Sequence, residues 1–235
     1  PEFMYLLTET ASPFALERWA AFFANFGQFA KGFFYTLGIS IGALIVALLL
    51  GLIFGAMSST HNKVLRGISR VYVEIFQNTP LLVQFVVVFY GISILTDGHV
   101  MIPISLTAIL CVGVYTGAYI SEIIRTGIEA VPKGQTEAAL SQGFTYSDTM
   151  RIIILPQAVR TILPPLTNQV VNLIKNTSTV AIISGADIMF TAKAWAYDTT
   201  NYVPAFAGAA FLYFIMCFPL ATWARRKEEE NKKAY

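Results

Sequence analysis

Long apolar segments alternate with short polar ones along this chain. Five of the apolar segments reach the roughly 20 residues that an α-helix needs to cross a bilayer. An earlier stretch mixes aromatic and acidic side chains at near-helical spacing, which is typical of an interfacial helix on a membrane surface. The pattern predicts an all-α, polytopic membrane protein with five transmembrane helices. The five segments run approximately over residues 33–57, 71–95, 104–124, 162–183 and 204–223, and the interfacial stretch over residues 14–29.

Composition supports a membrane protein. Of the 235 residues, 55% are hydrophobic and 13% are charged, and the mean hydropathy is +0.60. This balance is far from that of a soluble domain. The net charge of +2 is too small to indicate nucleic-acid binding. Cys111 and Cys217 lie in apolar stretches without the spacing of a metal site, and they are interpreted as packing residues.

The distribution of basic residues predicts the orientation. Lysine and arginine gather after the first and third apolar segments and in the C-terminal tail. Positively charged loops stay in the cytoplasm, so we expect the N terminus outside and the C terminus inside. The chain then divides into four parts: residues 1–3 as a cloning scar, 4–32 as an extracytoplasmic segment with the interfacial helix, 33–226 as the transmembrane domain, and 227–235 as a charged cytoplasmic tail.

A polar insert, residues 132–156, separates the third and fourth apolar segments. It opens on a proline, which lacks the amide hydrogen that a helix interior needs. Residues 135–142 favour helix, and Gly143 is placed to end that helix with a positive φ. Ser147 or Asp148 is predicted to cap the helix that follows. The insert therefore predicts a short helix that projects across the cytoplasmic face.

The spacing within the insert is specific. Its pattern is Glu-Ala-Ala, three residues, Gly, nine residues, then Ile153-x-Leu155-Pro156, where we expect Pro156 to bend or end the second helix. This pattern resembles the cytoplasmic coupling loop in the membrane subunit of bacterial ABC importers. The resemblance implies that one short helix contacts a groove of a separate ATP-binding subunit; the alternative is an ordinary amphipathic connector. The implied coupling residues are Glu137, Ala138, Ala139 and Gly143.

Three further motifs are similar to those of the polar amino-acid uptake permeases, which include histidine, glutamine, glutamate and arginine systems. They are residues 78–84 (NTPLLVQ), 118–125 (AYISEIIR) and 173–178 (LIKNTS). The resemblance implies the type I importer permease fold. It also implies a second permease subunit, identical or homologous, two ATPases and an extracytoplasmic substrate-binding protein, all at the bacterial inner membrane.

The chain itself contains no nucleotide site that we can identify. A phosphate-binding loop needs a Gly-Lys pair followed by Ser or Thr, and no Gly-Lys pair occurs in the sequence. We therefore expect a permease without enzymatic activity and without a cofactor of its own, and ATP and Mg²⁺ bound by the partner ATPase.

Polar residues inside the apolar segments are candidates for substrate contact, because an amino-acid zwitterion needs fixed polar partners in a membrane. The fourth segment contains a polar cluster in which asparagines recur every four residues, near one face of a helix. Hydrogen bonding between helices is the alternative role. The candidates are Asn172, Asn176, Thr177 and Ser178, with Gln84, Tyr115 and Thr116 as a second rank from neighbouring segments. Lys175 is interpreted as a structural residue that pairs with Glu74 or Glu122.

Two other functions compete with an amino-acid importer. An ABC permease for another small solute would share the coupling loop. A carrier driven by an ion gradient would show acidic residues at midmembrane and inverted repeats, whereas the acidic residues here lie near segment ends. The sequence favours the ATP-driven amino-acid importer.

Overall fold

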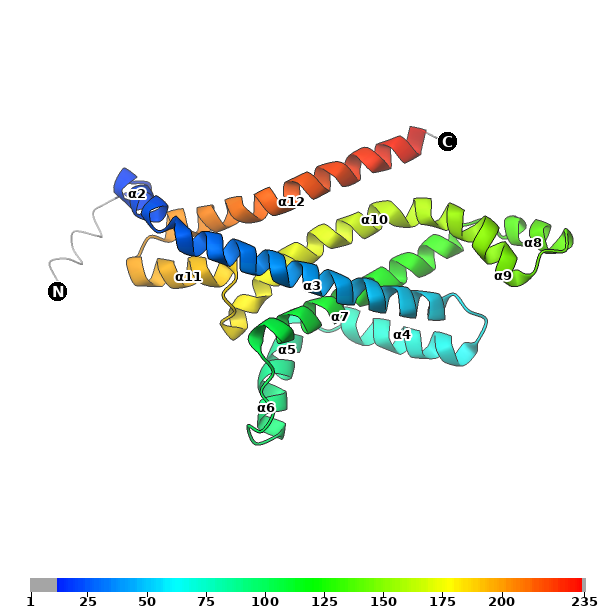
Figure 1. Cartoon of the computed structure of the whole chain (residues 1–235), viewed down its shortest axis with the longest axis horizontal. Helices are drawn as coiled ribbons and strands as arrows, with labels where there is room; N and C mark the ends of the chain where they lie inside the picture. The colour runs from blue at the N-terminus through cyan, green and yellow to red at the C-terminus, as the bar shows by residue number, and fades with distance from the viewer. Residues whose placement is uncertain (1–11, 234–235) are drawn as a thin grey trace.

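The computed structural model describes residues 12–233, and in this part of the chain every regular element is a helix. Four long helices run along the long axis of the molecule (Figure 1). They are α3 (Phe26–Ser58), α7 (Ile104–Glu129), α10 (Leu155–Asn176) and α12 (Tyr202–Lys233). The predicted all-α fold is confirmed. The proposed scar at residues 1–3 and most of the N-terminal segment before α2 lie outside the described residues.

Short helices occupy the two ends of the long axis (Figure 1). At one end, α2 (Leu16–Ala24) lies near α11 (Ile188–Thr199), which follows α10 through the 3₁₀-helix η3 (Thr177–Ile183). At the other end, α8 (Lys133–Ser141) and α9 (Tyr146–Asp148) connect to α10 through the π-helix η2 (Thr149–Ile154). We predict that this second end faces the cytoplasm, because it contains the polar insert.

Small residues hold α3 and α7 close together. A Cβ atom added to Gly113 of α7 would lie 2.7 Å from Cβ of Val46, and one added to Gly55 of α3 would lie 2.8 Å from Cβ of Ile124. Glycine removes the atoms that would keep the two backbones apart, as in other membrane helix pairs. The glycines spaced four residues apart, Gly51 and Gly55 on α3 and Gly113 and Gly117 on α7, therefore lie where the two helices cross.

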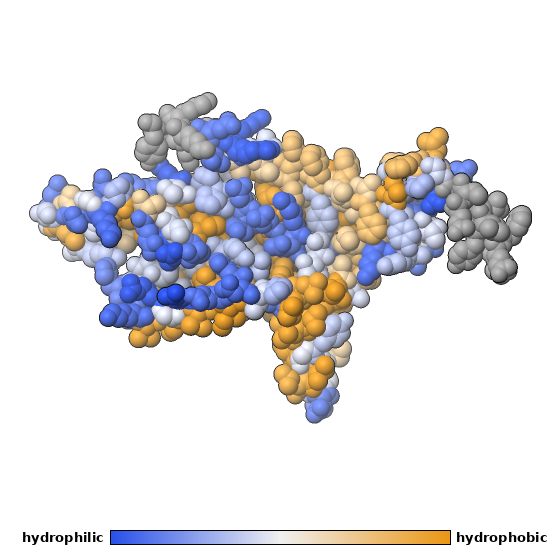
Figure 2. Space-filling model, turned by 180° about the vertical axis from the view of Figure 1, so that it is seen from behind, coloured by the Kyte–Doolittle hydropathy of each residue, from blue (hydrophilic) through white to orange (hydrophobic). Residues whose placement is uncertain are grey.

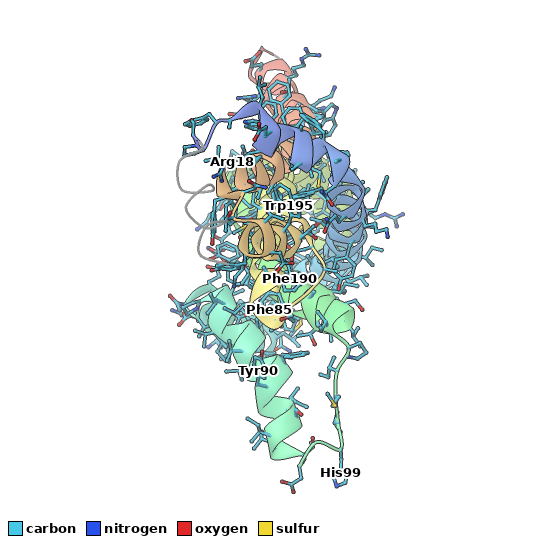
Figure 3. All side chains as sticks on the ribbon, turned by 90° about the vertical axis from the view of Figure 1, so that its left-hand side faces the viewer. Arg18, Phe85, Tyr90, His99, Phe190 and Trp195 are labelled. Atoms are coloured by element: carbon cyan, nitrogen blue, oxygen red, sulfur yellow. The ribbon has the colours of Figure 1, made fainter. Side chains whose placement is uncertain are left out.

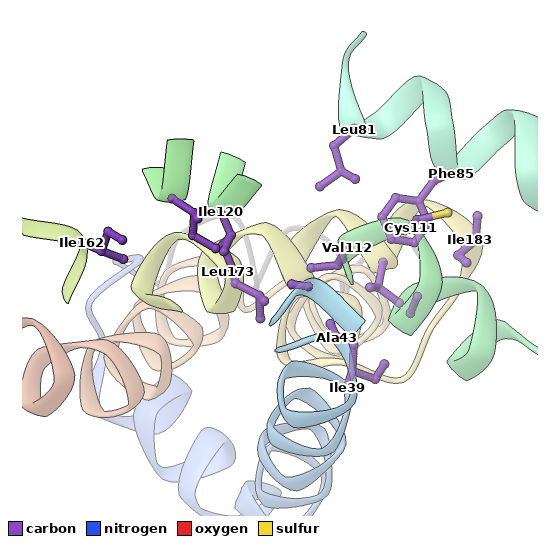
Figure 4. Close-up of a cluster of buried hydrophobic side chains, with 14 of the residues drawn as sticks. Ile39, Ala43, Leu81, Phe85, Cys111, Val112, Ile120, Ile162, Leu173 and Ile183 are labelled. Carbon is purple, nitrogen blue, oxygen red and sulfur yellow. The ribbon is translucent and has the colours of Figure 1, made fainter. Parts of the chain in front are cut away.

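Two hydrophobic cores stabilise the bundle. The first joins α3, α7 and α10 to α5 (Leu81–Val86), and Phe85 and Val112 are fully buried in it (Figure 4). The second lies at the α2 end and contains Trp195 (Figure 3). The ring centroid of Trp195 lies 5.7 Å from that of Phe29. The side chain of Asp187, also buried, accepts a hydrogen bond from the Met189 amide at 2.9 Å and so caps α11.

The predicted second span, residues 71–95, is wrong as a single helix. The structure has α4 (Lys63–Gln77), then a break, then α5, the π-helix η1 (Val87–Gly91) and α6 (Ile92–Leu95). The two halves meet at 97°, so residues 81–95 form an arm that projects from the bundle (Figures 1 and 3).

Side chains around the break donate hydrogen bonds to the backbone carbonyl groups that it leaves without helical partners. The Asn78 side-chain amide donates to the Glu74 carbonyl at 2.8 Å, and the Thr79 hydroxyl donates to the Ile75 carbonyl at 2.7 Å. Nε2 of Gln84 donates to the Thr79 carbonyl at 3.2 Å. Pro80 then precedes α5 without an amide hydrogen to satisfy. The predicted interruption at Pro80 is confirmed, but it is a sharp bend rather than a kink within one span.

The membrane spans differ from the predicted boundaries. Three described helices are long and apolar enough to cross a membrane, at residues 26–58, 104–129 and 202–229, and the bent pair would make four. The predicted span 162–183 is instead the second half of α10 followed by η3, because Pro156 is accommodated in the first turn of α10 rather than ending a helix. Polar residues recur along α10, so it has no uninterrupted apolar stretch like those within α3, α7 and α12. The count of five spans stays a prediction.

The N-terminal stretch also differs. Residues 14–29 do not form one interfacial helix, because Asn25 separates α2 from α3 and its side-chain amide donates to the Ala21 carbonyl at 2.9 Å. The first long helix therefore begins at Phe26, seven residues before the predicted boundary at residue 33.

Candidate functional site

The short helix predicted within the polar insert is present as α8, and Gly143 ends it as expected. Gly143 has φ +88°, its amide donates to the Leu140 carbonyl at 3.0 Å, and the Phe144 amide donates to the Ala139 carbonyl at 3.1 Å. These two hydrogen bonds form a Schellman motif, in which a left-handed residue stops the helix and satisfies its last carbonyls. The prediction of a positive φ at Gly143 is confirmed.

The four residues of the predicted coupling set differ in exposure. Glu137, Ala138 and Gly143 are exposed, whereas Ala139 is buried. Because α8 contacts η2, Ala139 faces the chain's own fold, and the other three residues are available to a partner.

The next turn is capped by a residue that the sequence analysis missed. The Thr145 hydroxyl oxygen, rather than Ser147 or Asp148, accepts a hydrogen bond from the Asp148 amide at 3.2 Å. The ring of Tyr146 in α9 packs edge-on against His61 in the loop after α3, with centroids 4.9 Å apart. This contact joins the α8–α9 region to a second loop at the same end of the molecule.

The candidate substrate residues of α10 and η3 divide into two groups. Asn172 is exposed and Asn176 is half-buried. The hydroxyls of Thr177 and Ser178 donate to the carbonyls of Ile174 and Lys175, at 2.6 and 2.8 Å, so helix backbone already satisfies them as donors. The asparagines are therefore the better candidates for binding an external group.

Lys175 lies on the exposed side of α10 and forms no ion pair among the described residues. The predicted pairing with Glu74 or Glu122 is wrong, because both carboxylates have arginine partners on their own helices. A cavity of about 290 Å³ between η3 and α12 is lined by Lys175, Ser178 and Tyr213, among others.

The second rank of candidates lies elsewhere. Gln84 caps the α4–α5 break, and the hydroxyl oxygens of Tyr115 and Tyr119 lie 3.1 Å apart. Thr116 is buried, and neither its hydroxyl oxygen nor Oε1 of Gln84 has a hydrogen-bond partner among the described residues. Gln84, Tyr115 and Thr116 do not line the cavity that contains Ser178.

Sequence reasoning missed a larger polar groove of about 710 Å³ between α4 and α7. Charged side chains at helical spacing line it, with Arg70 bound to Glu74 and Arg125 bound to both Glu122 and Glu129. Seen from behind, hydrophilic side chains gather over the half of the molecule that carries α8, while the projecting arm is largely hydrophobic (Figure 2). The i, i+4 repeat of Arg66, Arg70 and Glu74 was the available sequence signal.

Long apolar helices with an exposed polar helix at one end are typical of an integral membrane protein. The chain belongs to the family of binding-protein-dependent transport system inner membrane components, whose family model matches residues 47–228. The membrane subunit of a binding-protein-dependent transport system, as the sequence motifs indicated, is thereby confirmed.

Relatives within this family transport amino acids according to their names. The chain is 37% identical over 216 residues to the probable glutamine ABC transporter permease protein GlnM of Bacillus subtilis, covering 91% of this chain and 97% of the relative. It is 33% identical to the glutamate/aspartate import permease protein GltJ of Escherichia coli, covering 81% and 85%. It is 36% identical to the L-cystine transport system permease protein TcyB of Bacillus subtilis, covering 81% and 80%.

Solved structures agree with the fold. A crystal structure of an amino acid ABC transporter with histidines superposes with a TM-score of 0.83 at 30% identity, covering 90% of this chain and 97% of the other. An inward-facing MetNI methionine ABC transporter superposes with a TM-score of 0.68 at 17% identity, covering 87% and 98%, which supports the fold alone. The type I permease fold is thus confirmed.

Proposed function

We propose that this chain forms the translocation path for a polar amino acid in an ATP-driven importer and couples to a separate ATPase through α8. Glutamine, glutamate or aspartate, and cystine are named for three of its relatives. A path for such solutes must offer neutral hydrogen-bonding groups along its wall, because uncompensated charge is costly in a membrane.

The observation that carries this proposal is the exposed polar stripe of α10. Asn168, Asn172 and Lys175 are exposed on the surface of the chain, although α10 is one of four long helices in a membrane bundle. A polar stripe does not face hydrocarbon. We infer that a second permease subunit, identical or homologous, covers it and encloses an aqueous path with Asn172 and Asn176 on its wall.

Coupling through α8 rests on its position and its exposed side chains. The helix lies at the far end of the long axis, where it can contact another protein without disturbing the bundle (Figure 1). We propose that Glu137, Ala138 and Gly143 contact the ATPase, which binds ATP and Mg²⁺, and that Ala139 transmits the contact to η2. An extracytoplasmic binding protein delivers the amino acid at the α2–α11 end.

Uptake into proteoliposomes tests the proposed path. The chain is reconstituted with its ATPase and its binding protein, and the half-saturating concentration is measured for L-glutamine, L-glutamate and L-cystine. If Asn176 or Asn172 binds a charged group of the substrate, its replacement by alanine should weaken the binding free energy by about 1–3 kcal/mol. The half-saturating concentration should then rise about 5- to 150-fold.

Thr167→Ala is the matched control, because Thr167 is a polar residue of the same helix that points about 100° away from Asn168 and donates its hydroxyl to the Leu163 carbonyl. Asparagine variants that assemble, hydrolyse ATP and keep the half-saturating concentration of Thr167→Ala contradict their place in the path.

A further inference from the structure

The groove between α4 and α7 runs along much of the length of α4. Its walls run along α4 from Lys63 to Gln77 and along α7 from Glu129 back to Ser121. Fourteen residues of α-helix rise by about 21 Å, so the groove reaches from the predicted cytoplasmic loops toward the bend at residues 78–80. With a volume of about 710 Å³, it is large enough for an amino acid.

Ser121 presents an unused polar group in this groove. The residue is 1% exposed, lines the groove, and its hydroxyl oxygen has no hydrogen-bond partner among the described residues. Hydroxyls of other helices in this chain donate to a carbonyl four residues earlier, as Ser40 does to Thr36 and Ser141 to Glu137. A buried hydroxyl without such a bond carries a free-energy penalty that a bound ligand would remove.

The charges of the groove are arranged in opposite pairs. Nε of Arg70 lies 2.8 Å from Oε1 of Glu74, and both side chains are mostly exposed, at 81% and 59%. Such exposed pairs are weak, so Arg70 and Glu74 can separate when a better partner arrives. Lys63 and Arg66, farther toward the loop, form no ion pair among the described residues.

By contrast, Arg125 is firmly held. Its Nε and Nη2 atoms donate to the two carboxylate oxygens of Glu122, and Nη1 donates to Glu129 at 2.6 Å. This bidentate geometry is the stronger kind of ion pair. The groove therefore has one rigid wall on α7 and one adaptable pair on α4.

We propose that this groove is a second, cytoplasmic-side binding site for the zwitterionic head of an α-amino acid. The guanidinium of Arg70 takes the ligand's carboxylate, the carboxylate of Glu74 takes its ammonium group, and the Ser121 hydroxyl donates to the carboxylate. The unpaired Lys63 and Arg66 attract the carboxylate toward the mouth of the groove. The site rests on the proposed import function and receives the amino acid after it has passed the α10 stripe.

Equilibrium binding on the complete transporter in nanodiscs tests the site, with L-glutamine, L-glutamate and L-histidine as probes and N-acetyl-L-glutamine as the probe without an ammonium group. Binding is measured in the Asn172→Ala, Asn176→Ala double variant, which weakens the proposed stripe and leaves the groove intact. We expect a retained site that does not take N-acetyl-L-glutamine. In the same background, Arg70→Gln or Glu74→Gln should weaken binding about tenfold or more, and Ser121→Ala about fivefold.

The control is Arg226→Gln, which removes one exposed cytoplasmic charge outside the groove. Ser121→Ala keeps every charge, so it tests the site even if the ion-pair variants assemble poorly. The site is overturned if Ser121→Ala and Arg70→Gln both bind the amino acid as tightly as their parent, or if Arg226→Gln weakens binding equally. In either case, uptake by the wild type still upholds the import function. Absence of both uptake and binding in the wild type overturns the two together.

Discussion

Replacement of Gly143 tests whether α8 must end where it does. The residue sits at φ +88°, and a Cβ atom added there would meet no other atom within 4 Å. The whole cost of Gly143→Ala is therefore conformational. A left-handed conformation costs an ordinary L-residue about 1–2 kcal/mol, which raises the population of frayed helix ends about 5- to 30-fold.

Fraying at this point removes the Schellman hydrogen bonds and shifts Phe144 relative to Ala139. We expect Gly143→Ala to lower the number of amino-acid molecules transported per ATP hydrolysed and to weaken co-purification of the ATPase. Gly143→Asn should be milder, because asparagine enters the left-handed region more readily. Gly143→Asp adds a charge at the partner surface, and we expect it to abolish transport while the protein remains in the membrane.

The matched control is Gly134→Ala in the first turn of the same helix. A Cβ atom there also meets nothing within 4 Å, but the backbone is helical, so alanine should leave coupling unchanged. The number of amino-acid molecules transported per ATP hydrolysed is measured for each variant in proteoliposomes made from equal amounts of assembled complex. If Gly143→Ala couples as well as Gly134→Ala, or if Gly143→Asn is the more damaged of the two Gly143 variants, the reasoning is refuted.

Three further predictions test the fold and the orientation. Single cysteines at Gln135 and Asp198 should react with an impermeant thiol reagent from opposite sides of the membrane, and reaction from one side contradicts the predicted orientation. Asp187→Ala should lower the free energy of unfolding by about 0.5–2 kcal/mol, because the cap of α11 is lost. Asp187→Asn should retain most of the stability that the cap provides. Equal melting temperatures for Asp187→Ala and the wild type contradict the capping role. Gly117→Leu should prevent close approach of α3 and α7 and lower the yield of folded protein, because its Cβ would lie 3.1 Å from Cβ of Leu50; a normal yield argues against the crossing.

Local chemistry explains what the sequence could predict. The end of α8 depends on Gly143 and its neighbours within one helical turn, so its position and its sign of φ follow from residue type alone. The interruption at Pro80 is equally local, since proline has no amide hydrogen. The family motifs in turn led to the amino-acid permeases that the relatives confirm.

Tertiary contacts explain what the sequence could not predict. The 97° bend after α4 requires Asn78, Thr79 and Gln84 to cap the broken helix ends, and their spacing does not specify an angle. The partner of Glu74 was misjudged because Arg70, one helical turn earlier on α4, already pairs with it. The unpaired Ser121 hydroxyl has no sequence signature at all.

The central claim is that ATP hydrolysis in a partner chain drives amino-acid uptake through this membrane subunit. The most direct measurement is uptake of radiolabelled L-glutamine, L-glutamate and L-cystine into proteoliposomes that contain the chain, its ATPase and its binding protein, with ATP supplied on the ATPase side and ion gradients collapsed. The account predicts uptake of at least one of these amino acids that requires ATP and all of the components. Uptake that persists without the ATPase and follows an imposed ion gradient would contradict it.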